Sequence, residues 1–281
     1  MRNFRLITNA FKDKDLHLSR RIVSYIEDKG GRAGISVSNI EGVVAEDFPL
    51  TDIPDDTECI IVLGGDGTLI RAATKVESLG IPLIGVNLGT LGYLCELEET
   101  SVFAAIDRLM SDQFTIEERI MLSAQIDGSA RTQFALNDVV IHWTGDLSML
   151  QLQVYVNGNF LTTYHADGII VATPTGSTGY NLSAGGPIVE PGAKLIVITP
   201  VCPHSLNKSS IILGANDKIV IEMCDNKGVE EERVASFDGE LHCNLVSGDR
   251  VEIKMAKVHT QLVRTQQRSI LQTISKKMIN G

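Results

Sequence analysis

The sequence has no apolar run long enough to cross a bilayer, and its N-terminus lacks the basic, apolar and small-residue order of a signal peptide. We therefore expect no membrane partner and a cytoplasmic location. Basic residues are also few, since 25 Lys and Arg stand against 35 Asp and Glu, which gives a formal net charge of −10. Because nucleic-acid surfaces need clustered Lys and Arg, we expect no nucleic-acid partner.

Cysteine pairs and the common nucleotide-binding signatures are missing as well. The five cysteines are widely spread without a C-x-x-C pair, which predicts neither a disulfide framework nor a zinc site. There is no G-x-x-x-x-G-K-[ST] motif, and Gly65-Asp66-Gly67 is followed by Ile70 where a dinucleotide fingerprint needs its third glycine. A phosphate-binding turn, if present, must be of another kind.

The segment from Glu58 to Leu69 reads E-C-I-I-V-L-G-G-D-G-T-L. Its apolar part, 59–63, is typical of a strand buried on both faces of a parallel sheet. Three glycines around Asp66 then form a turn, and Thr68 opens a helical pattern. The segment therefore predicts a strand, a glycine turn and a helix.

This turn suits an anionic ligand, because glycines let the backbone approach closely and the helix start offers free amides and a positive dipole end. A carboxylate in the middle of the turn is a poor choice for holding phosphate alone. Asp66 therefore predicts a second task, either accepting a hydroxyl proton or helping to hold a metal ion that carries the phosphate. The plainer interpretation is that Asp66 caps the helix that begins near Thr68.

The pattern of elements changes near residue 116. Before it, strands expected at 4–8, 35–37, 59–63 and 81–86 alternate with helices along 18–26, 69–79 and 101–110. Alternation of this kind predicts an open parallel sheet with ligands at the carboxyl ends of its strands. After it, strands are expected at 121–126, 134–142, 150–156, 168–172, 194–199, 211–213, 218–223, 234–237 and 249–254.

We therefore expect an α/β fold followed by an all-β fold. The N-terminal α/β domain would comprise residues 1–115, and the C-terminal all-β domain residues 116–264. A last helix near 267–278, within the segment 265–281, would return to pack on the first domain.

The second half of the chain contains an unusual segment from Tyr164 to Glu190. An apolar strand runs into T-P-T-G-S-T-G-Y at residues 173–180. Hydroxyls and free amides can bond an adenine edge, a ribose or a phosphate without adding charge, and Tyr180 can lie against a ring. Asp167 precedes the strand, where it can reach a sugar hydroxyl or an amide. The alternative is a surface turn rich in Ser and Thr, although such turns rarely have S-A-G-G-P after them.

Six motifs in order carry a resemblance to a known family: Gly64–Thr68, Asn87–Leu94, Asn137–Asp138, Ala166–Val189, Pro200–Leu206 and Asp238–Gly239. They resemble the NAD kinases, specifically the compact bacterial ones, over nearly the whole chain. The resemblance implies a Rossmann-like N-terminal domain, a β-sandwich-like C-terminal domain and a homodimer or homotetramer. It also implies transfer of the terminal phosphoryl group of ATP, or of polyphosphate in some members, to the 2′-hydroxyl of the adenosine ribose of NAD, with a divalent metal such as Mg²⁺.

The resemblance also implies roles for single residues. Asp66 matches the general base that takes the proton of the 2′-hydroxyl. The phosphate-donor loop matches Gly64, Gly65, Gly67 and Thr68. The dinucleotide-contacting positions match Asp66, Gly67, Arg71, Asn137, Asp138, His165, Asp167, Thr175, Thr178, Gly179, Tyr180, Asn181, Leu182 and Ser183. The metal ligands are left open.

Three positions depart from the family's pattern. Asp138 stands where Glu is usual, which shortens the reach of the carboxylate by one methylene. Gly179 replaces a common Ala, which is a mild change. Glu240 stands where Gln is common, so an anion that cannot donate replaces a neutral donor and acceptor.

Two other functions share parts of this pattern. Lipid kinases of the diacylglycerol and sphingosine type carry the G-G-D-G-T turn, but the line 166–189 fits a dinucleotide site, and no amphipathic segment for a membrane surface stands out. A non-catalytic NAD(H)-binding regulator on the same scaffold is the other alternative. The presence of Asp66 beside an intact glycine turn favours the enzyme.

Overall fold

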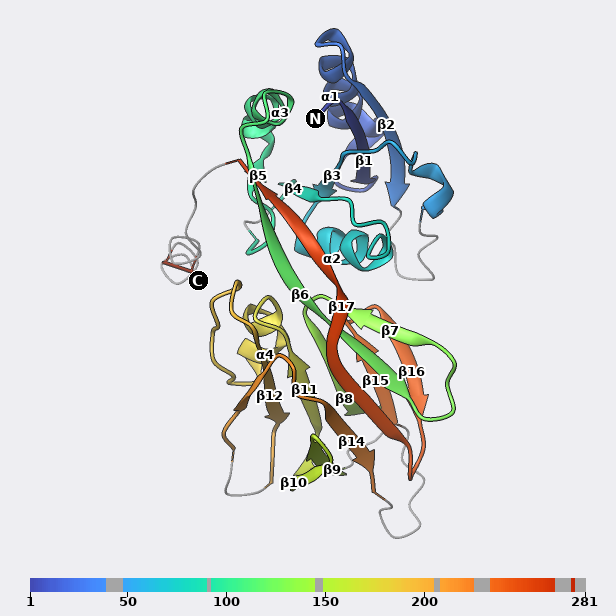
Figure 1. Cartoon of the computed structure of the whole chain (residues 1–281), viewed down its shortest axis with the longest axis vertical. Coiled ribbons are helices and arrows are strands. Elements are labelled where there is room, and N and C mark those ends of the chain that lie inside the picture. Colours follow the sequence, from blue (N-terminus) through green and yellow to red (C-terminus); the bar gives the residue numbers. More distant parts are fainter. Residues whose placement is uncertain are drawn as a thin grey trace. The chain divides into compact units, whose positions relative to one another are not determined.

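The structure, a computed structural model, describes residues 1–38, 48–89, 92–144, 149–204, 208–224, 233–265 and 274–275. The chain divides into two compact units (Figure 1). Unit 1 comprises Met1–Glu118 and the described residues from Thr260 onward, and unit 2 comprises Arg119–His259. Unit 1 contains parallel strands with helices and unit 2 contains antiparallel strands, so the predicted combination of α/β and all-β folds is confirmed.

Unit 1 is an open parallel sheet. Its elements are β1 (Asn3–Asn9), α1 (His17–Asp28), β2 (Arg32–Ser38), β3 (Cys59–Gly64), α2 (Asp66–Lys75), β4 (Leu83–Asn87), β5 (Leu97–Glu98) and α3 (Val102–Met110), with short 3₁₀ turns at Lys14–Leu16, Leu50–Asp52 and Glu99–Ser101. The strand order is β2-β1-β3-β4, and every pair in it is parallel. Because β1 has β2 on one side and β3 on the other, the winding of the sheet reverses between β1 and β3. Open α/β sheets bind ligands at the carboxyl ends of such strands.

Helix α1 buries one face and is held at its start by a carboxylate. Leu18, Ile22 and Ile26 recur at helical spacing and belong to the core of unit 1, which explains why this segment is a helix. The buried carboxylate of Asp13 accepts the N–H groups of Leu18 at 2.8 Å and Ser19 at 3.0 Å. Asp13 therefore satisfies amides of the first turn that have no partner within the helix.

Unit 2 consists of two antiparallel sheets. Its elements are β6 (Thr115–Ile126), β7 (Thr132–Ala135), β8 (Asp138–Trp143), β9 (Leu150–Val156), β10 (Asn159–Ala166), β11 (Gly168–Ala172), η4 (Gly176–Thr178), α4 (Tyr180–Ser183), β12 (Leu195–Val201), β13 (Ile211–Gly214), β14 (Ile219–Met223), β15 (Arg233–Phe237), β16 (Leu241–Leu245) and β17 (Arg250–Arg264). One sheet has the order β13-β12-β11-β8-β15-β16. The other contains β10-β9-β14-β17, with β6 beside β17 and β7 beside β6.

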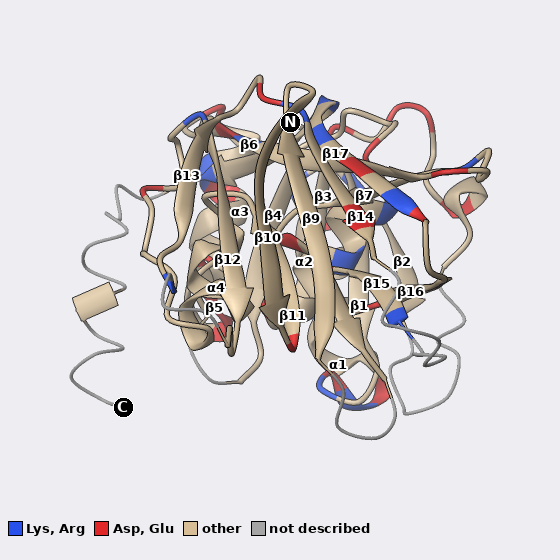
Figure 2. Cartoon of the chain, turned by 90° about the horizontal axis from the view of Figure 1, so that it is seen from below, with Lys and Arg blue, Asp and Glu red and all other residues tan. Residues whose placement is uncertain are grey.

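The two sheets of unit 2 share one apolar core, as expected of a β-sandwich. Ile141 of β8, Ile198 of β12 and Leu152 of β9 belong to the same buried cluster. The opposite face of β11 is also covered, because Ile170 packs with Val189 from the segment that follows α4. Burial on both faces explains why β11 and β12 are almost purely apolar. Strands β9 to β12 contain no Lys, Arg, Asp or Glu and are drawn tan along nearly all of their length in Figure 2.

The predicted strand at 134–142 is wrong, because the structure has two strands there, β7 and β8. The carboxylate of Asp238 accepts the N–H groups of Leu136, Asn137 and Asp138 at 2.8, 2.7 and 3.1 Å. These amides therefore bond to a side chain where the strands break.

Strands β10, β16 and the short β5 are additional to those predicted. β10 follows β9 through a turn at Asn157–Gly158, where both residues have positive φ angles of 52° and 81°, as in a type I′ hairpin. A register shift between Phe160 and Thr162 interrupts its alternation, which is why the pattern was weak. β17 extends well beyond the predicted 249–254. The remaining predicted elements are confirmed apart from shifts at their ends, but the predicted helix at 267–278 lies outside the described residues except for 274–275.

We expect Asp13→Asn to lower the free energy of unfolding by about 1–2 kcal/mol, because one amide oxygen would replace a carboxylate on which four donors from Thr8, Leu18 and Ser19 converge. Asp15→Asn removes the same charge from an exposed residue of the same loop and should change this energy by less than about 0.5 kcal/mol. Urea unfolding followed by circular dichroism measures both. Equal losses in the two variants would contradict the role of Asp13.

Candidate functional site

The glycine turn lies at the carboxyl end of β3, as predicted. Gly64 ends the strand, Gly65 precedes the helix, and Asp66 is the first residue of α2. A Cβ atom at position 64 would lie 2.3 Å from Oγ1 of Thr68, so only glycine lets Thr68 pack against the end of the strand. Arg71 follows in the second turn of α2 and is partly buried. The first amides of α2 have no carbonyl partner within the helix and are suited to an anion.

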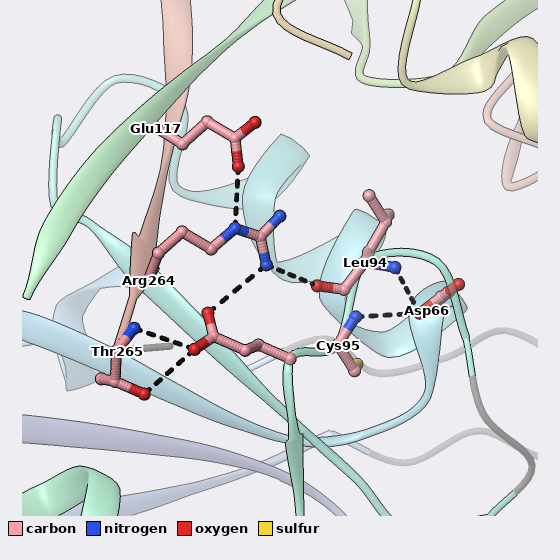
Figure 3. Close-up of polar contacts among 7 residues, drawn as sticks. Asp66, Leu94, Cys95, Glu117, Arg264 and Thr265 are labelled. Atoms are coloured by element: carbon pink, nitrogen blue, oxygen red, sulfur yellow. Dashed lines mark hydrogen bonds and ion pairs between the residues drawn. The ribbon is translucent and has the colours of Figure 1, made fainter. Parts of the chain in front are cut away.

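The carboxylate of Asp66 is held by the chain segment that follows β4 (Figure 3). Its Oδ2 accepts the N–H of Tyr93 at 2.6 Å, and its Oδ1 accepts those of Leu94 and Cys95, both at 3.1 Å. Because these bonds go to another loop, Asp66 does not simply cap its own helix. A carboxylate has about four acceptor positions, so Oδ2 has room for one more donor.

Gly92 makes this arrangement possible. A Cβ atom at position 92 would lie 1.9 Å from Oδ1 of Asp66 and 2.4 Å from Oδ2. The loop also packs closely on β4, since a Cβ atom at Gly85 would lie 2.8 Å from Sγ of Cys95. Burial, and secondarily the charge of Asp66, raises the pKa of the Cys95 thiol, which keeps it protonated.

Arg264, at the end of β17, fixes the same loop from the other side (Figure 3). Its guanidinium donates to the carbonyl of Leu94 at 3.4 Å and to the Glu117 carboxylate at 2.7 Å. It also pairs at 3.6 Å with Glu96, whose side chain is 2% exposed and accepts the N–H and hydroxyl of Thr265. These contacts connect the loop after β4 to the end of β17.

In unit 2, the predicted pair Asn137 and Asp138 lies beside the loop that follows β11. The carbonyl of Asn137 accepts the N–H of Thr173 at 2.8 Å, and a Cβ atom at Gly176 would lie only 2.1 Å from that oxygen. A Cβ atom at Gly179 would lie 3.5 Å from Nδ2 of Asn137 and 3.8 Å from Oδ2 of Asp138. The two side chains therefore face Gly179, and the buried Oδ1 of Asn137 has no hydrogen-bond partner among the described residues.

Asp138 is an unusual carboxyl group. It is 5% exposed, and burial, with a smaller contribution from the charge of Asp238, raises its pKa to about 7. Two of the departures from the family's pattern, Asp138 and Gly179, thus face each other, and both are smaller than the residues they replace. The third, Glu240, lies in an exposed turn after β15.

Tyr180 begins α4 and is 46% exposed. Burial, and then the charges of Cys202, Asp167 and Asp138, raises the pKa of its hydroxyl. Oδ1 of Asp167 lies 4.0 Å from Nε2 of His204. His165 accepts the N–H of His204 with its backbone carbonyl at 2.8 Å, while its own side chain is exposed.

Asn181 shapes the loop from inside. Its side chain is fully buried, its Nδ2 donates to the carbonyls of Ser177 at 3.1 Å and Pro187 at 3.0 Å, and its Oδ1 accepts the hydroxyl of Thr199 at 2.7 Å. A Cβ atom at Gly186 would lie 2.1 Å from that oxygen. The amide of Asn181 is thus engaged within the protein.

The other predicted loop residues differ in exposure. Thr175 is buried, and its Oγ1 accepts a weak bond from the buried guanidinium of Arg119 at 3.5 Å. Thr178 donates to the carbonyl of Thr175 at 3.3 Å. Leu182 and Ser183 are exposed.

Residues that the sequence did not single out also shape these sites. Gly92 lies within the motif 87–94, and a second glycine shortly after a strand end was a usable signal. No comparable sequence signal pointed to Arg119, Arg264 or Glu96, because charged residues beside strands usually belong to a solvated face.

Comparisons with known proteins give the family. The family models of the ATP-NAD kinase N-terminal domain and the ATP-NAD kinase C-terminal domain match residues 44–114 and 136–265. The NAD kinase of Agathobacter rectalis is 54% identical over 281 residues, which are 100% of this chain and 99% of that protein. The chain belongs to the NAD kinase family. The NAD kinase of Lachnospira eligens is 44% identical over 294 residues, covering 99% of this chain and 100% of that protein.

Two solved structures show the same fold. Yeast NADH kinase complexed with NADH has a TM-score of 0.84 at 24% identity, covering 99% of this chain and 87% of that chain. An NAD kinase from Archaeoglobus fulgidus in complex with ATP has a TM-score of 0.75 at 20% identity, covering 98% of each. Within the described residues, no helix is long and apolar enough to span a membrane. The NAD kinase family membership gives no support to the lipid-kinase alternative.

We expect Gly92→Ala to displace the Asp66 carboxylate from the amides of residues 93–95, because the added methyl group would overlap it. These amides should then exchange with deuterium about tenfold faster or more, as expected for the loss of charge-assisted hydrogen bonds. Mass spectrometry of exchanged peptides measures this. Gly89→Ala is the control in the same loop, since its methyl group would meet only Nζ of Lys12 at 3.7 Å. Unchanged exchange at residues 93–95 in Gly92→Ala would refute the contact.

We expect the contribution of Asp138 to stability to fall as the pH rises from about 4 to about 7. In this range the folded protein keeps a proton on Asp138 that the unfolded chain has lost, because the folded pKa is about 7 and the ordinary value is 3.8. The slope for one proton is at most about 1.4 kcal/mol per pH unit. Asp138→Asn should remove this part of the slope in urea titrations at several pH values. An identical slope in wild type and variant would show that Asp138 is not the group.

Proposed function

We propose that the protein is an NAD kinase that transfers the terminal phosphoryl group of ATP to the 2′-hydroxyl of the adenosine ribose of NAD, giving NADP⁺ and ADP. One observation carries the mechanism. Asp66 stands at the start of α2, at the carboxyl end of a parallel strand, with its carboxylate fixed by three backbone amides. The membership of the chain in the NAD kinase family supports the choice of substrates.

Asp66 acts as the general base in this proposal. Its Oδ2, which accepts one amide, takes the proton of the 2′-hydroxyl as that oxygen attacks the phosphorus. Phosphoryl transfer depends chiefly on positioning and charge stabilisation, so a carboxylate held by a rigid loop suits it. We assign the base a contribution of roughly 10² to 10⁴ in rate.

The glycine turn receives the phosphoryl group. Gly65 and Gly67 carry no side chain that would block the approach of a phosphate to the first amides of α2. The positive end of the helix dipole adds to the attraction. Thr68 supports the turn by packing against Gly64, and Arg71 follows as a basic group in the same helix.

The loop of unit 2 holds the dinucleotide. The buried Oδ1 of Asn137, which lacks a partner among the described residues, can accept a hydrogen bond from an amide or hydroxyl of the ligand. Asp138 and Asp167 offer carboxyl groups, and the half-exposed ring of Tyr180 offers a surface for a base. We reassign Asn181 to shaping the loop, because its side-chain amide is already engaged.

The protein residues fit a magnesium ion that arrives with the donor. Among the described residues no group of three or more His, Cys, Asp and Glu could hold a metal ion. Mg²⁺ usually needs only one or two protein oxygens when phosphates supply the others. Asn87 offers such an oxygen, since its Oδ1 is buried and has no hydrogen-bond partner in the described ranges. When bound, the ion neutralises charge on the phosphates.

We also propose that the protein acts in the cytoplasm as a homodimer or homotetramer. The resemblance to compact bacterial NAD kinases is the support for both statements. Light scattering coupled to size-exclusion chromatography would give the mass of the assembly.

The test is an assay of purified protein with ATP, Mg²⁺ and NAD, scored for NADP⁺ by a dehydrogenase that accepts only the phosphorylated cofactor. Asp66→Asn should keep its dissociation constant for NAD but lose about 10²- to 10⁴-fold in kcat. Asp15→Asn, which removes one charge from an exposed loop residue, should retain full activity.

Unchanged turnover in Asp66→Asn would contradict the assigned base. If folded wild-type protein binds NAD but forms no NADP⁺, the non-catalytic regulator is the better account. If it does not bind NAD at all, the proposed substrate and the assigned dinucleotide site are both contradicted.

A further inference from the structure

We propose that Arg264 is a positioning residue for Asp66 and acts on it through the backbone of residues 94 and 95. The guanidinium of Arg264 holds the carbonyl side of this backbone, and the carboxylate of Asp66 is held by its amide side. Arg264 is assigned no contact with either substrate. The inference rests on the proposed function, because it takes Asp66 to be the general base whose position sets the rate.

A single peptide group joins the two side chains. Its carbonyl belongs to Leu94 and accepts a hydrogen bond from Nη1 of Arg264 at 3.4 Å. Its N–H belongs to Cys95 and donates to Oδ1 of Asp66 at 3.1 Å. The group is trans and planar, so its C=O and N–H point in opposite directions. Figure 3 accordingly shows Arg264 and Asp66 on opposite sides of this backbone. Displacing the carbonyl therefore displaces the N–H that fixes Asp66.

The same peptide group also connects the two charges. A guanidinium at the carbonyl oxygen polarises the peptide group, which makes its N–H a stronger donor to a carboxylate. At 3.4 Å, however, the bond from Arg264 to the carbonyl is long. We therefore assign most of the effect of Arg264 to the position of the backbone and less of it to polarisation.

Two carboxylates keep the guanidinium of Arg264 beside this carbonyl. Its Nε donates to Glu117 at 2.7 Å, and its Nη1 lies 3.6 Å from Oε2 of Glu96. The side chain of Arg264 is 21% exposed and that of Glu96 is 2% exposed, so solvent screens this pair little. A planar guanidinium with donors in a fixed fork can satisfy all three groups, whereas the ammonium group of Lys is a single point charge.

Glu96 connects the loop to the same strand end a second time. It follows Cys95 directly, and its Oε1 accepts the N–H of Thr265 at 2.8 Å and the hydroxyl of Thr265 at 3.0 Å. Two consecutive residues, Arg264 and Thr265, thus contact the loop. Replacing Arg264 would remove the cation beside a buried carboxylate, which is strongly destabilising in general. The experiment must therefore separate a loss of stability from a loss of positioning.

Steady-state kinetics of four variants test the role of Arg264. Arg264→Met removes the charge, and Arg264→Lys keeps a charge without the fork. In the double variant Arg264→Met/Glu96→Gln the buried carboxylate also becomes neutral, while Gln keeps an oxygen for Thr265. Arg250→Met is the matched control, because Arg250 begins the same strand, is exposed and pairs with Glu222 at 2.6 Å. Thermal unfolding measures the stability of each variant.

We expect Arg264→Met to lower kcat by roughly ten- to hundredfold, as for a catalytic group displaced by about 1 Å or less. Its KM and dissociation constant for NAD should stay within about threefold of the wild-type values, because only the position of the base changes. Arg264→Lys should recover part of the lost kcat. The double variant should be more stable than Arg264→Met but keep the low kcat, and Arg250→Met should turn over like wild type.

A second comparison tests whether the effect passes through Asp66. In the Asp66→Asn background, Arg264→Met should lower kcat by less than about threefold, because the residue that it positions is no longer a base. The amides of residues 93–95 should exchange with deuterium faster in Arg264→Met than in wild type, and at the wild-type rate in Arg250→Met.

A wild-type kcat in Arg264→Met would overturn the inference. So would recovery of kcat together with stability in the double variant, because Arg264 would then act only on the fold. An equal loss from Arg264→Met with Asp or Asn at position 66 would also overturn it, since the effect would not pass through that carboxylate. Failure of the proposed function is distinguishable: wild type would form no NADP⁺, while faster exchange at residues 93–95 in Arg264→Met would still support the contact.

Discussion

The contact between the Asp66 carboxylate and three consecutive backbone amides is the interaction on which the proposed active site depends. A carboxylate at the start of a helix would ordinarily turn toward the helix's own amides. Here Gly92 leaves the space for it to reach another loop, and Arg264 with Glu96 holds that loop in place. The position of one oxygen atom of Asp66 is thus set by α2, by the loop after β4 and by the end of β17.

A similar contact between a carboxylate and three consecutive backbone amides occurs in unit 2. The carboxylate of Asp238 accepts hydrogen bonds from the three consecutive N–H groups of residues 136–138, and these bonds lie where β7 ends and β8 begins. Asn137 therefore lies between the two strands and Asp138 begins β8, and the side chains of both residues face Gly179. In both units a carboxylate organises a loop. In unit 1 Gly92, which has no room for a side chain, allows the carboxylate to approach, whereas in unit 2 Gly176 lets the loop after β11 approach the carbonyl of Asn137. The residues with chemical roles are therefore distinct from some of those that position them.

The sequence was informative where local physics decides the structure. The apolar run before the glycine turn, and the hydroxyl-rich line after β11, indicated both the elements and the candidate residues. It was less informative where distant segments meet. Nothing local in 134–142 shows that Asp238 will divide it, and the bulge in β10 hides its alternation. Likewise Arg264 acquires its place only through the order of the strands, which periodicity does not reveal.

The most direct measurement of the central claim is the phosphorus NMR spectrum of the products formed from ATP, Mg²⁺ and NAD. The account predicts a single new phosphomonoester, coupled to the 2′ proton of the adenosine ribose, in an amount equal to the ADP formed. ADP without this signal, or a phosphate on another hydroxyl group, would contradict it.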